Sequence, residues 1–166
     1  MLDDWIPMDE LYALLMLLAA NGAPIVAGKL LGRRWDAPLD CGWRLADGRA
    51  LLGPSKTLRG VVAAVLATML LGLLLGYPWQ LGCAIGGLAM LGDALSSFIK
   101  RRLGIASGGM APGLDHIPES LLPLIACKSM LGLSWGGVLG LSLAFMIANI
   151  LLSRLLYRLG VRDHPY

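Results

Sequence analysis

Long apolar runs separated by short polar stretches dominate the chain. A hydrocarbon core about 30 Å thick needs roughly 20 apolar residues for each helix that crosses it. Five segments fit, near residues 9–28, 58–76, 81–99, 117–133 and 135–156. The fourth is the weakest because it carries Glu119 and Lys128, so it could be partly re-entrant or shielded by its neighbours. The pattern predicts an all-α integral membrane protein with about five transmembrane helices in a single domain, residues 1–166.

Composition supports the membrane class. Hydrophobic residues make up 57% of the 166 positions and charged residues only 15%, whereas soluble domains carry about 25% charged residues. The net charge is only +3, and we expect a lipid bilayer and no nucleic acid as partner. The three cysteines are widely spaced and form no CxxC pair, so we interpret them as buried apolar residues and not as disulfides or zinc ligands.

Cations occupy alternate loops between the predicted spans. The first loop, 29–57, holds Lys and Arg at six positions, and the third loop begins with the sequence KRR at 100–102. The loop "YPWQ" has no cation, while the tail after the fifth span again carries arginines. The positive-inside rule then places the N-terminus outside and the C-terminus in the cytoplasm of the cell (inner) membrane. The polar loops therefore meet on the cytoplasmic face, where we expect the site.

The third span carries a polar stripe. Asp93, Ser96, Ser97 and Lys100 are spaced i, i+3, i+4 and i+7, which puts them on one face of a helix. A structural interpretation pairs Asp93 with Lys100 or Arg101 and lets the serines join helices. A metal ligand or functional acid is the stronger interpretation, because carboxylates within membrane spans are usually functional.

A second acid, Asp115, precedes the fourth span. It could simply cap that helix, with Pro118 in the first turn. Because the third and fourth spans must run antiparallel after a short loop, Asp115 is also expected to approach Asp93. Two adjacent carboxylates repel unless a cation lies between them. Hard oxygen ligands favour magnesium over zinc.

A third polar cluster, "DGRALLGPSKTLRG" at 47–60, opens the second span. Ser55, Lys56, Thr57 and Arg59 gather at a helix N-terminus, where free N–H groups and the helix dipole favour an anion. The stretch is not a P-loop, because the glycine before the lysine is absent. Cations that only set topology are the simpler alternative. Together, two acids, several cations and an adjoining membrane suit phosphoryl or nucleotidyl transfer to a lipid.

Two of these stretches carry a resemblance. "GDALSSFIKRR" followed by "LDHIPES" resembles the C-terminal signature of the phosphatidate cytidylyltransferase superfamily, and "GPSKTLRG" resembles its upstream element. The short length, the five spans, "NGAPI" at 21–25 and "PLD" at 38–40 are similar to the CDP-archaeol synthase family. The resemblance covers roughly residues 18–133.

The resemblance implies an enzyme that joins CTP to a lipid phosphate with magnesium and releases pyrophosphate. Asp93 and Asp115 would bind the metal and, with Lys100, serve catalysis. The implied substrate-binding residues are Asn21, Asp40, Ser55, Lys56, Thr57, Arg59, Ser97, Arg101 and Glu119. The lipid would be archaeol-phosphate-like or phosphatidate-like, and a homodimer is left open.

One position departs from the family pattern. The family has a second aspartate three residues after the first, where this chain has Pro118, followed by Glu119. Glu119 could replace that acid, or the change could mark another lipid substrate or a lost activity. The rival functions are a CTP-dependent lipid kinase of the same superfamily and a non-catalytic small membrane transporter or lipid-binding protein.

Overall fold

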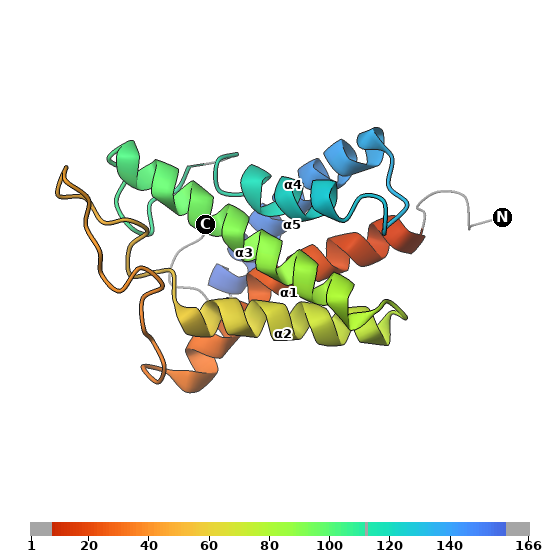
Figure 1. Cartoon of the computed structure of the whole chain (residues 1–166), viewed down its shortest axis with the longest axis horizontal. Helices are drawn as coiled ribbons and strands as arrows, with labels where there is room; N and C mark the ends of the chain where they lie inside the picture. The colour runs from red at the N-terminus through yellow and green to blue at the C-terminus, as the bar shows by residue number, and fades with distance from the viewer. Residues whose placement is uncertain (1–7, 112, 159–166) are drawn as a thin grey trace.

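The computed structural model describes residues 8–111 and 113–158, and these form a bundle of five α-helices (Figure 1). Its helices run alternately between two ends of the molecule. Apart from two isolated β-bridges, the described residues hold no β-structure. The helices are α1 (Met8–Leu31), α2 (Leu58–Leu74), α3 (Trp79–Arg102), α4 (Ile117–Ala126) and α5 (Trp135–Arg158).

The prediction of five helices in a membrane-type bundle is confirmed, but the helices differ in length. α1, α3 and α5 each have 24 residues and are apolar enough to cross a membrane, with mean hydropathies of 1.7, 1.5 and 1.9 over their best windows. α2 is shorter, with 17 residues. α4 has only 10 residues, which at 1.5 Å per residue is about half of a bilayer core.

The expected fourth span, 117–133, is therefore wrong in its extent. The α-helix ends at Ala126, and turns occupy the chain from there to 132. Gly132 has a φ of +61°, which reverses the chain before α5 begins. α4 is shielded by its neighbours, as one of the alternatives for this weak segment anticipated: Glu119, Ser120, Pro123 and Leu124 are all buried.

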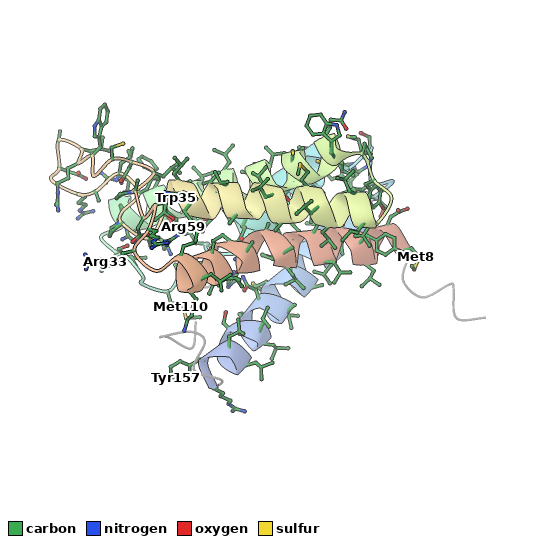
Figure 2. All side chains as sticks on the ribbon, turned by 90° about the horizontal axis from the view of Figure 1, so that it is seen from below. Met8, Arg33, Trp35, Arg59, Met110 and Tyr157 are labelled. Carbon is green, nitrogen blue, oxygen red and sulfur yellow. The ribbon has the colours of Figure 1, made fainter. Side chains whose placement is uncertain are left out.

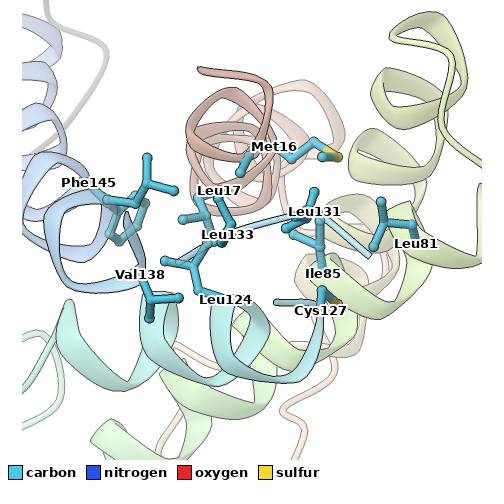
Figure 3. Close-up of a cluster of buried hydrophobic side chains, with 12 residues drawn as sticks. Met16, Leu17, Leu81, Ile85, Leu124, Cys127, Leu131, Leu133, Val138 and Phe145 are labelled. Carbon is cyan, nitrogen blue, oxygen red and sulfur yellow. The ribbon is translucent and has the colours of Figure 1, made fainter. Parts of the chain in front are cut away.

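An apolar core joins four of the helices at the end of the bundle where α4 meets α5 (Figure 3). Its buried members come from α1, α3, α4, α5 and the connection between α4 and α5. They are Ala13, Met16, Leu17, Leu81, Ile85, Leu124, Cys127, Leu131, Leu133, Val138, Leu141 and Phe145. This core holds the helices together at the end away from the long polar loops.

Glycines allow α3 to approach its neighbours closely. A Cβ on Gly82 would lie 2.5 Å from the carbonyl oxygen of Thr68, and one on Gly86 would lie 2.3 Å from the Thr68 hydroxyl. α2 and α3 therefore pack backbone to backbone, as small residues spaced by four allow in membranes. On the α4 side, a Cβ on Gly92 would lie 2.2 Å from the carbonyl oxygen of Pro118. This contact brings Asp93 and Glu119 to neighbouring walls of one site.

The two long loops, 32–57 and 103–116, lie at the same end of the bundle (Figure 1). The starts of α2 and α4 and the ends of α1, α3 and α5 meet there. The sequence-based expectation that the polar stretches gather at one end is confirmed. α5 leaves the other helices obliquely toward its C-terminal end (Figure 2).

Candidate active site

A cavity of about 660 Å³ opens at the end of the bundle where the loops gather. Every helix contributes to its walls, together with loop residues between α1 and α2 and between α3 and α4. All predicted site residues except Asp40 line it, namely Asn21, Ser55, Lys56, Thr57, Arg59, Asp93, Ser97, Lys100, Arg101, Asp115 and Glu119. Residues almost a hundred positions apart in the chain are thus brought to one place.

Two acid–lysine pairs are the main charged feature of the cavity. Lys56 Nζ lies 2.5 Å from Asp93 Oδ2, and Lys100 Nζ lies 2.5 Å from Asp115 Oδ1. Asp93 is thus paired with a lysine from the loop before α2, and not with Lys100 or Arg101 as the structural interpretation of the sequence supposed. The acids keep 25% and 22% of their side chains exposed. Both pairs are therefore open to an incoming anion or cation.

The glycine-rich loop after α3 is held by the second pair. Lys100 also donates to the carbonyl oxygen of Gly109 at 3.1 Å, and Asp115 Oδ2 accepts from the N–H of Ala111 at 2.7 Å. Ser107 lies 3.3 Å from Ser55, hydroxyl to hydroxyl, which joins this loop to the loop before α2. The glycines 108 and 109 thereby form part of the cavity wall.

Two of the residues predicted to bind an anion also organise the fold. Thr57 caps α2 by accepting a hydrogen bond from the N–H of Gly60 at 3.2 Å. Arg59 donates to the carbonyl oxygens of Gly32 and Arg34 at 2.7 and 2.9 Å and pairs with Asp36 at 2.8 Å. The guanidinium of Arg59 therefore holds the end of α1 and the following loop against α2.

Two further predicted residues, Ser97 and Arg101, are buried on α3. Ser97 is 3% exposed and Arg101 is 7% exposed. Arg101 donates to the carbonyl oxygen of Ala106 at 2.9 Å, while its Nε has no hydrogen-bond partner within the described residues. Arg101 lines the cavity, and a guanidinium is suited to bind an anion there.

Glu119 and Asn21 connect α4 to α1 across the cavity. The Asn21 side-chain amide donates to Glu119 Oε1 at 2.7 Å, and Glu119 is only 1% exposed. Glu119 therefore faces the same cavity as Asp93 and Asp115. The position next to the missing family aspartate thus holds a buried carboxylate with a defined partner.

Asp40 is the predicted substrate-binding residue that the structure does not bring to the cavity. Its carboxylate instead accepts hydrogen bonds from the N–H groups of Gly42, Leu52 and Gly53 at 3.0, 2.8 and 2.9 Å. Burial alone would raise the pKa of Asp40, but these backbone donors outweigh it and hold the pKa below its ordinary value. Asp40 shapes the loop that leads to Ser55.

α5 contributes wall residues that the sequence reasoning did not propose. Ile150, Ser153 and Arg154 line the cavity. Asn149, which precedes Ile150, is buried. Its Nδ2 lies 3.2 Å from His116 Nδ1, and this contact joins α5 to the start of α4. The only signal in the sequence is the interruption of a long apolar run by these polar residues, which does not reveal their neighbours.

The residues present suit magnesium only together with a phosphate ligand. Among the residues that the structure describes, no group of three or more His, Cys, Asp or Glu side chains is arranged to hold a metal ion. Magnesium is commonly bound by one or two carboxylates plus substrate phosphates and water. Asp93 and Asp115, two accessible carboxylates on one cavity, provide that donor set.

Comparisons with known proteins agree with this geometry. A model of the CarS-like family, CDP-archaeol synthase, matches residues 4–84 and 79–166. The CDP-archaeol synthase of Aeropyrum pernix is 35% identical over 98% of this chain and 96% of its own length, and that of Sulfurisphaera tokodaii is 35% identical over 94% and 93%.

A solved structure is also similar. It is described as giving structural insight into an intramembrane enzyme for archaeal membrane lipid biosynthesis. It matches with a TM-score of 0.66 and 34% identity over 85% of this chain and 90% of that one. Sequence and fold therefore agree over nearly the whole length, and the chain belongs to the CDP-archaeol synthase family.

Proposed function

We propose that this chain transfers the cytidylyl group of CTP to the phosphate of a membrane lipid, giving a CDP-lipid and pyrophosphate. The observation that carries the proposal is the cavity where two acid–lysine pairs, a buried arginine and a capped helix N-terminus converge. The names of the relatives favour an archaeol-type lipid phosphate over a phosphatidate.

The cations of the cavity would bind the phosphates of CTP. Lys56 and Lys100 are held beside their acids and can exchange a carboxylate oxygen for a phosphate oxygen with little movement. Arg101 lines the same cavity and stays charged at neutral pH. The hydroxyls of Ser55, Thr57 and Ser97 line the same wall and can donate hydrogen bonds to phosphate oxygens.

Release of the lysines would free Asp93 and Asp115 to hold magnesium with the triphosphate oxygens. The metal would neutralise charge on the triphosphate and on the leaving pyrophosphate. Both acids come from structured positions, one inside α3 and one just before α4, so their separation is set by helix packing. The contact between Gly92 and Pro118 fixes that packing.

The transfer itself needs no protein nucleophile. An oxygen of the lipid phosphate, an anion at neutral pH, forms a bond to the α-phosphorus of CTP. The bond from that phosphorus to the oxygen bridging to the β-phosphate breaks, and pyrophosphate leaves with the electron pair. The protein's task is to position the two anions and balance their charge.

We also propose that the cavity faces the cytoplasm. The cations of loop 29–57, of residues 100–102 and of the end of α5 lie at the cavity end. Such clusters favour the cytoplasmic side, where CTP is made.

Position-specific labelling of CTP tests the proposed reaction. The full chain, reconstituted in vesicles with an ether-lipid phosphate, should retain label from the α-phosphate in the lipid and release label from the γ-phosphate as pyrophosphate. Label from the γ-position in the lipid would mean a lipid kinase. No lipid label from either position would mean a transporter or lipid-binding protein, and either result would overturn the proposal.

A pair of matched variants tests the acids. Asp93→Asn should lower turnover by on the order of 10²-fold, comparable to the cost of removing one hydrogen-bond donor that stabilises transition-state charge, and should shift the magnesium dependence. Asp47→Asn is the control. Asp47 lies on the exposed loop before α2, pairs with Arg102 at the end of α3 and does not line the cavity. A folded Asp93→Asn protein with normal turnover would contradict the metal assignment.

A further inference from the structure

Among the residues that the structure describes, five cationic side chains line the cavity, and four of them have a partner from the chain itself. Lys56 and Lys100 pair with Asp93 and Asp115. Arg59 pairs with Asp36 and two carbonyl oxygens, and Arg101 donates to the carbonyl oxygen of Ala106. The fifth, Arg154, has neither a hydrogen bond nor an ion pair to any residue that the structure describes.

We propose that Arg154 of α5 binds the phosphate of the lipid acceptor. The inference rests on the proposed function and deepens it, because it assigns different binding residues to the two reacting anions, the triphosphate of CTP and the phosphate of the lipid. The nucleotide phosphates belong to the cations of α3 and of the loop before α2. The acceptor phosphate belongs to the one cavity-lining cation on α5.

The position of Arg154 on α5 supports this assignment. One face of α5 exposes large apolar side chains at every fourth residue, Leu139, Leu143, Ile147, Leu151 and Leu155. Arg154, with Ile150 and Ser153, lines the cavity instead. Lipid chains lying along the apolar face would therefore bring a phosphate group to the level of Arg154.

The cavity also offers apolar side chains to a lipid. Pro24 and Ile25 of α1 line it together with Ile150, which lies one turn before Arg154 on α5. α5 diverges from the other helices toward this end, with Tyr157 far from Arg59 (Figure 2). A lipid phosphate could thus approach from the side of α5 while CTP contacts the loops.

The guanidinium group is suited to this ligand. It stays charged, and its planar donors match a phosphate in a bidentate manner. Its aliphatic stem can lie along apolar surface while the head reaches a polar site. Because Arg154 has no carboxylate partner in the described residues, binding a phosphate would not require an existing ion pair to break.

The same chemistry could serve a bulk anionic headgroup of the membrane. Arg158 separates the two sources, because it lies one turn farther along α5, is also exposed and does not line the cavity. A general headgroup contact would involve both arginines alike. An acceptor site would involve Arg154 alone.

The test measures transfer kinetics of the full chain in neutral-lipid vesicles, with a dialkylglycerol phosphate as the varied acceptor. Arg154→Ala should raise the KM for the lipid phosphate by roughly 10- to 100-fold, the size expected for loss of a charge-assisted hydrogen bond. The KM for CTP should stay within about twofold, and Arg154→Lys should recover part of the loss because it restores charge but not the bidentate geometry. Arg158→Ala should match the wild type.

A change in the KM for CTP, equal effects of the two alanine variants, or an unchanged lipid KM would each overturn the assignment. A binding experiment tests the Arg154 site separately from the proposed reaction. Retention of radiolabelled dialkylglycerol phosphate by the immobilised protein, competed with the uncharged dialkylglycerol, should fall in Arg154→Ala and not in Arg158→Ala. If the wild type binds in this way but transfers nothing, the proposed reaction fails while the Arg154 site stands.

Discussion

Individual residues of the cavity combine structural and chemical tasks. Thr57 caps α2, Arg59 anchors the end of α1, and Lys100 holds the glycine-rich loop through Gly109. In each case the same side chain also lines the cavity. A substitution at such a position is expected to alter loop geometry as well as binding, so tests of the chemistry need isosteric changes and a separate measure of folding.

Glu119→Gln separates the acidic group from the structural hydrogen bond. It keeps an oxygen that can accept from the Asn21 amide, whose bond to Glu119 is 2.7 Å long, and it removes the ionisable carboxyl group. We predict near-normal thermal stability but clearly lower turnover, most evident at low magnesium, because this carboxyl group lies on the same cavity as Asp93 and Asp115. Thermal unfolding and a magnesium titration of the purified variant measure both quantities.

The simpler role for Glu119 predicts a different outcome. If it only favours the dipole at the start of α4, the Gln variant should lose about 0.3–1 kcal/mol of stability and keep full activity. Glu119→Leu is the companion variant, since it also removes the acceptor for Asn21. It should lower stability as well as turnover, because it leaves a part-buried amide without its partner.

Between elements, the close contact of α2 with α3 determines where the cations meet the acids. α2 begins directly after Lys56 and Thr57, and α3 carries Asp93 and Lys100. Gly82 lies at this interface, where a Cβ would come within 2.5 Å of a backbone oxygen and 2.6 Å of the Met69 Cα. Neither atom can move without shifting α2.

Gly82→Ala is therefore expected to lower the stability of the bundle by about 1–3 kcal/mol, the usual cost of overpacking, and to reduce activity by displacing α2. Gly87→Ala on the same helix is the control, because a Cβ there meets nothing within 4 Å. It should be neutral or stabilise by up to about 1 kcal/mol through helix propensity. Thermal unfolding in detergent measures the stability of both variants. Equal losses of stability in Gly82→Ala and Gly87→Ala would contradict the packing argument.

At the scale of the whole molecule, the bundle has an apolar-core end and a polar-loop end (Figures 1 and 3). The interpretation of all three cysteines as buried residues is wrong for Cys41, which lies exposed on the loop at the polar end; Cys83 is partly exposed and Cys127 is buried. The side of the membrane that this end faces is therefore open to a chemical test at Cys41.

A membrane-impermeant thiol reagent added outside intact cells should not label Cys41 in a variant that has lost Cys83 and Cys127. Labelling should appear after permeabilisation, because the proposed topology, which follows from the cations in the loops, puts this end in the cytoplasm. The converse variant, Cys41→Ser with Gln80→Cys at the exposed start of α3, should be labelled from outside. Strong external labelling of Cys41 would invert the topology and remove the cavity from cytoplasmic CTP.

The sequence alone determined the membrane class, the approximate positions of the helices and most of the polar residues that line the cavity. Hydropathy is a local property, so runs of apolar residues locate helices whatever their neighbours are. The polar stretches also stood out against apolar surroundings, since charge inside a membrane protein is costly without a purpose. Asp93, Asp115, Lys56 and Lys100 could therefore be selected before their contacts were known.

Only the tertiary structure decided which of these residues are partners. Spacing along the third span suggested Lys100 or Arg101 as the partner of Asp93. The partner is Lys56, from a loop that helix packing brings to α3. The carboxylate of Asp40 accepts hydrogen bonds from backbone N–H groups of its own loop and does not line the cavity. α4 stops at Ala126, and Arg154 reaches the cavity from a helix without a motif. Such choices depend on how closely helices approach, and spacing along one chain does not encode that distance.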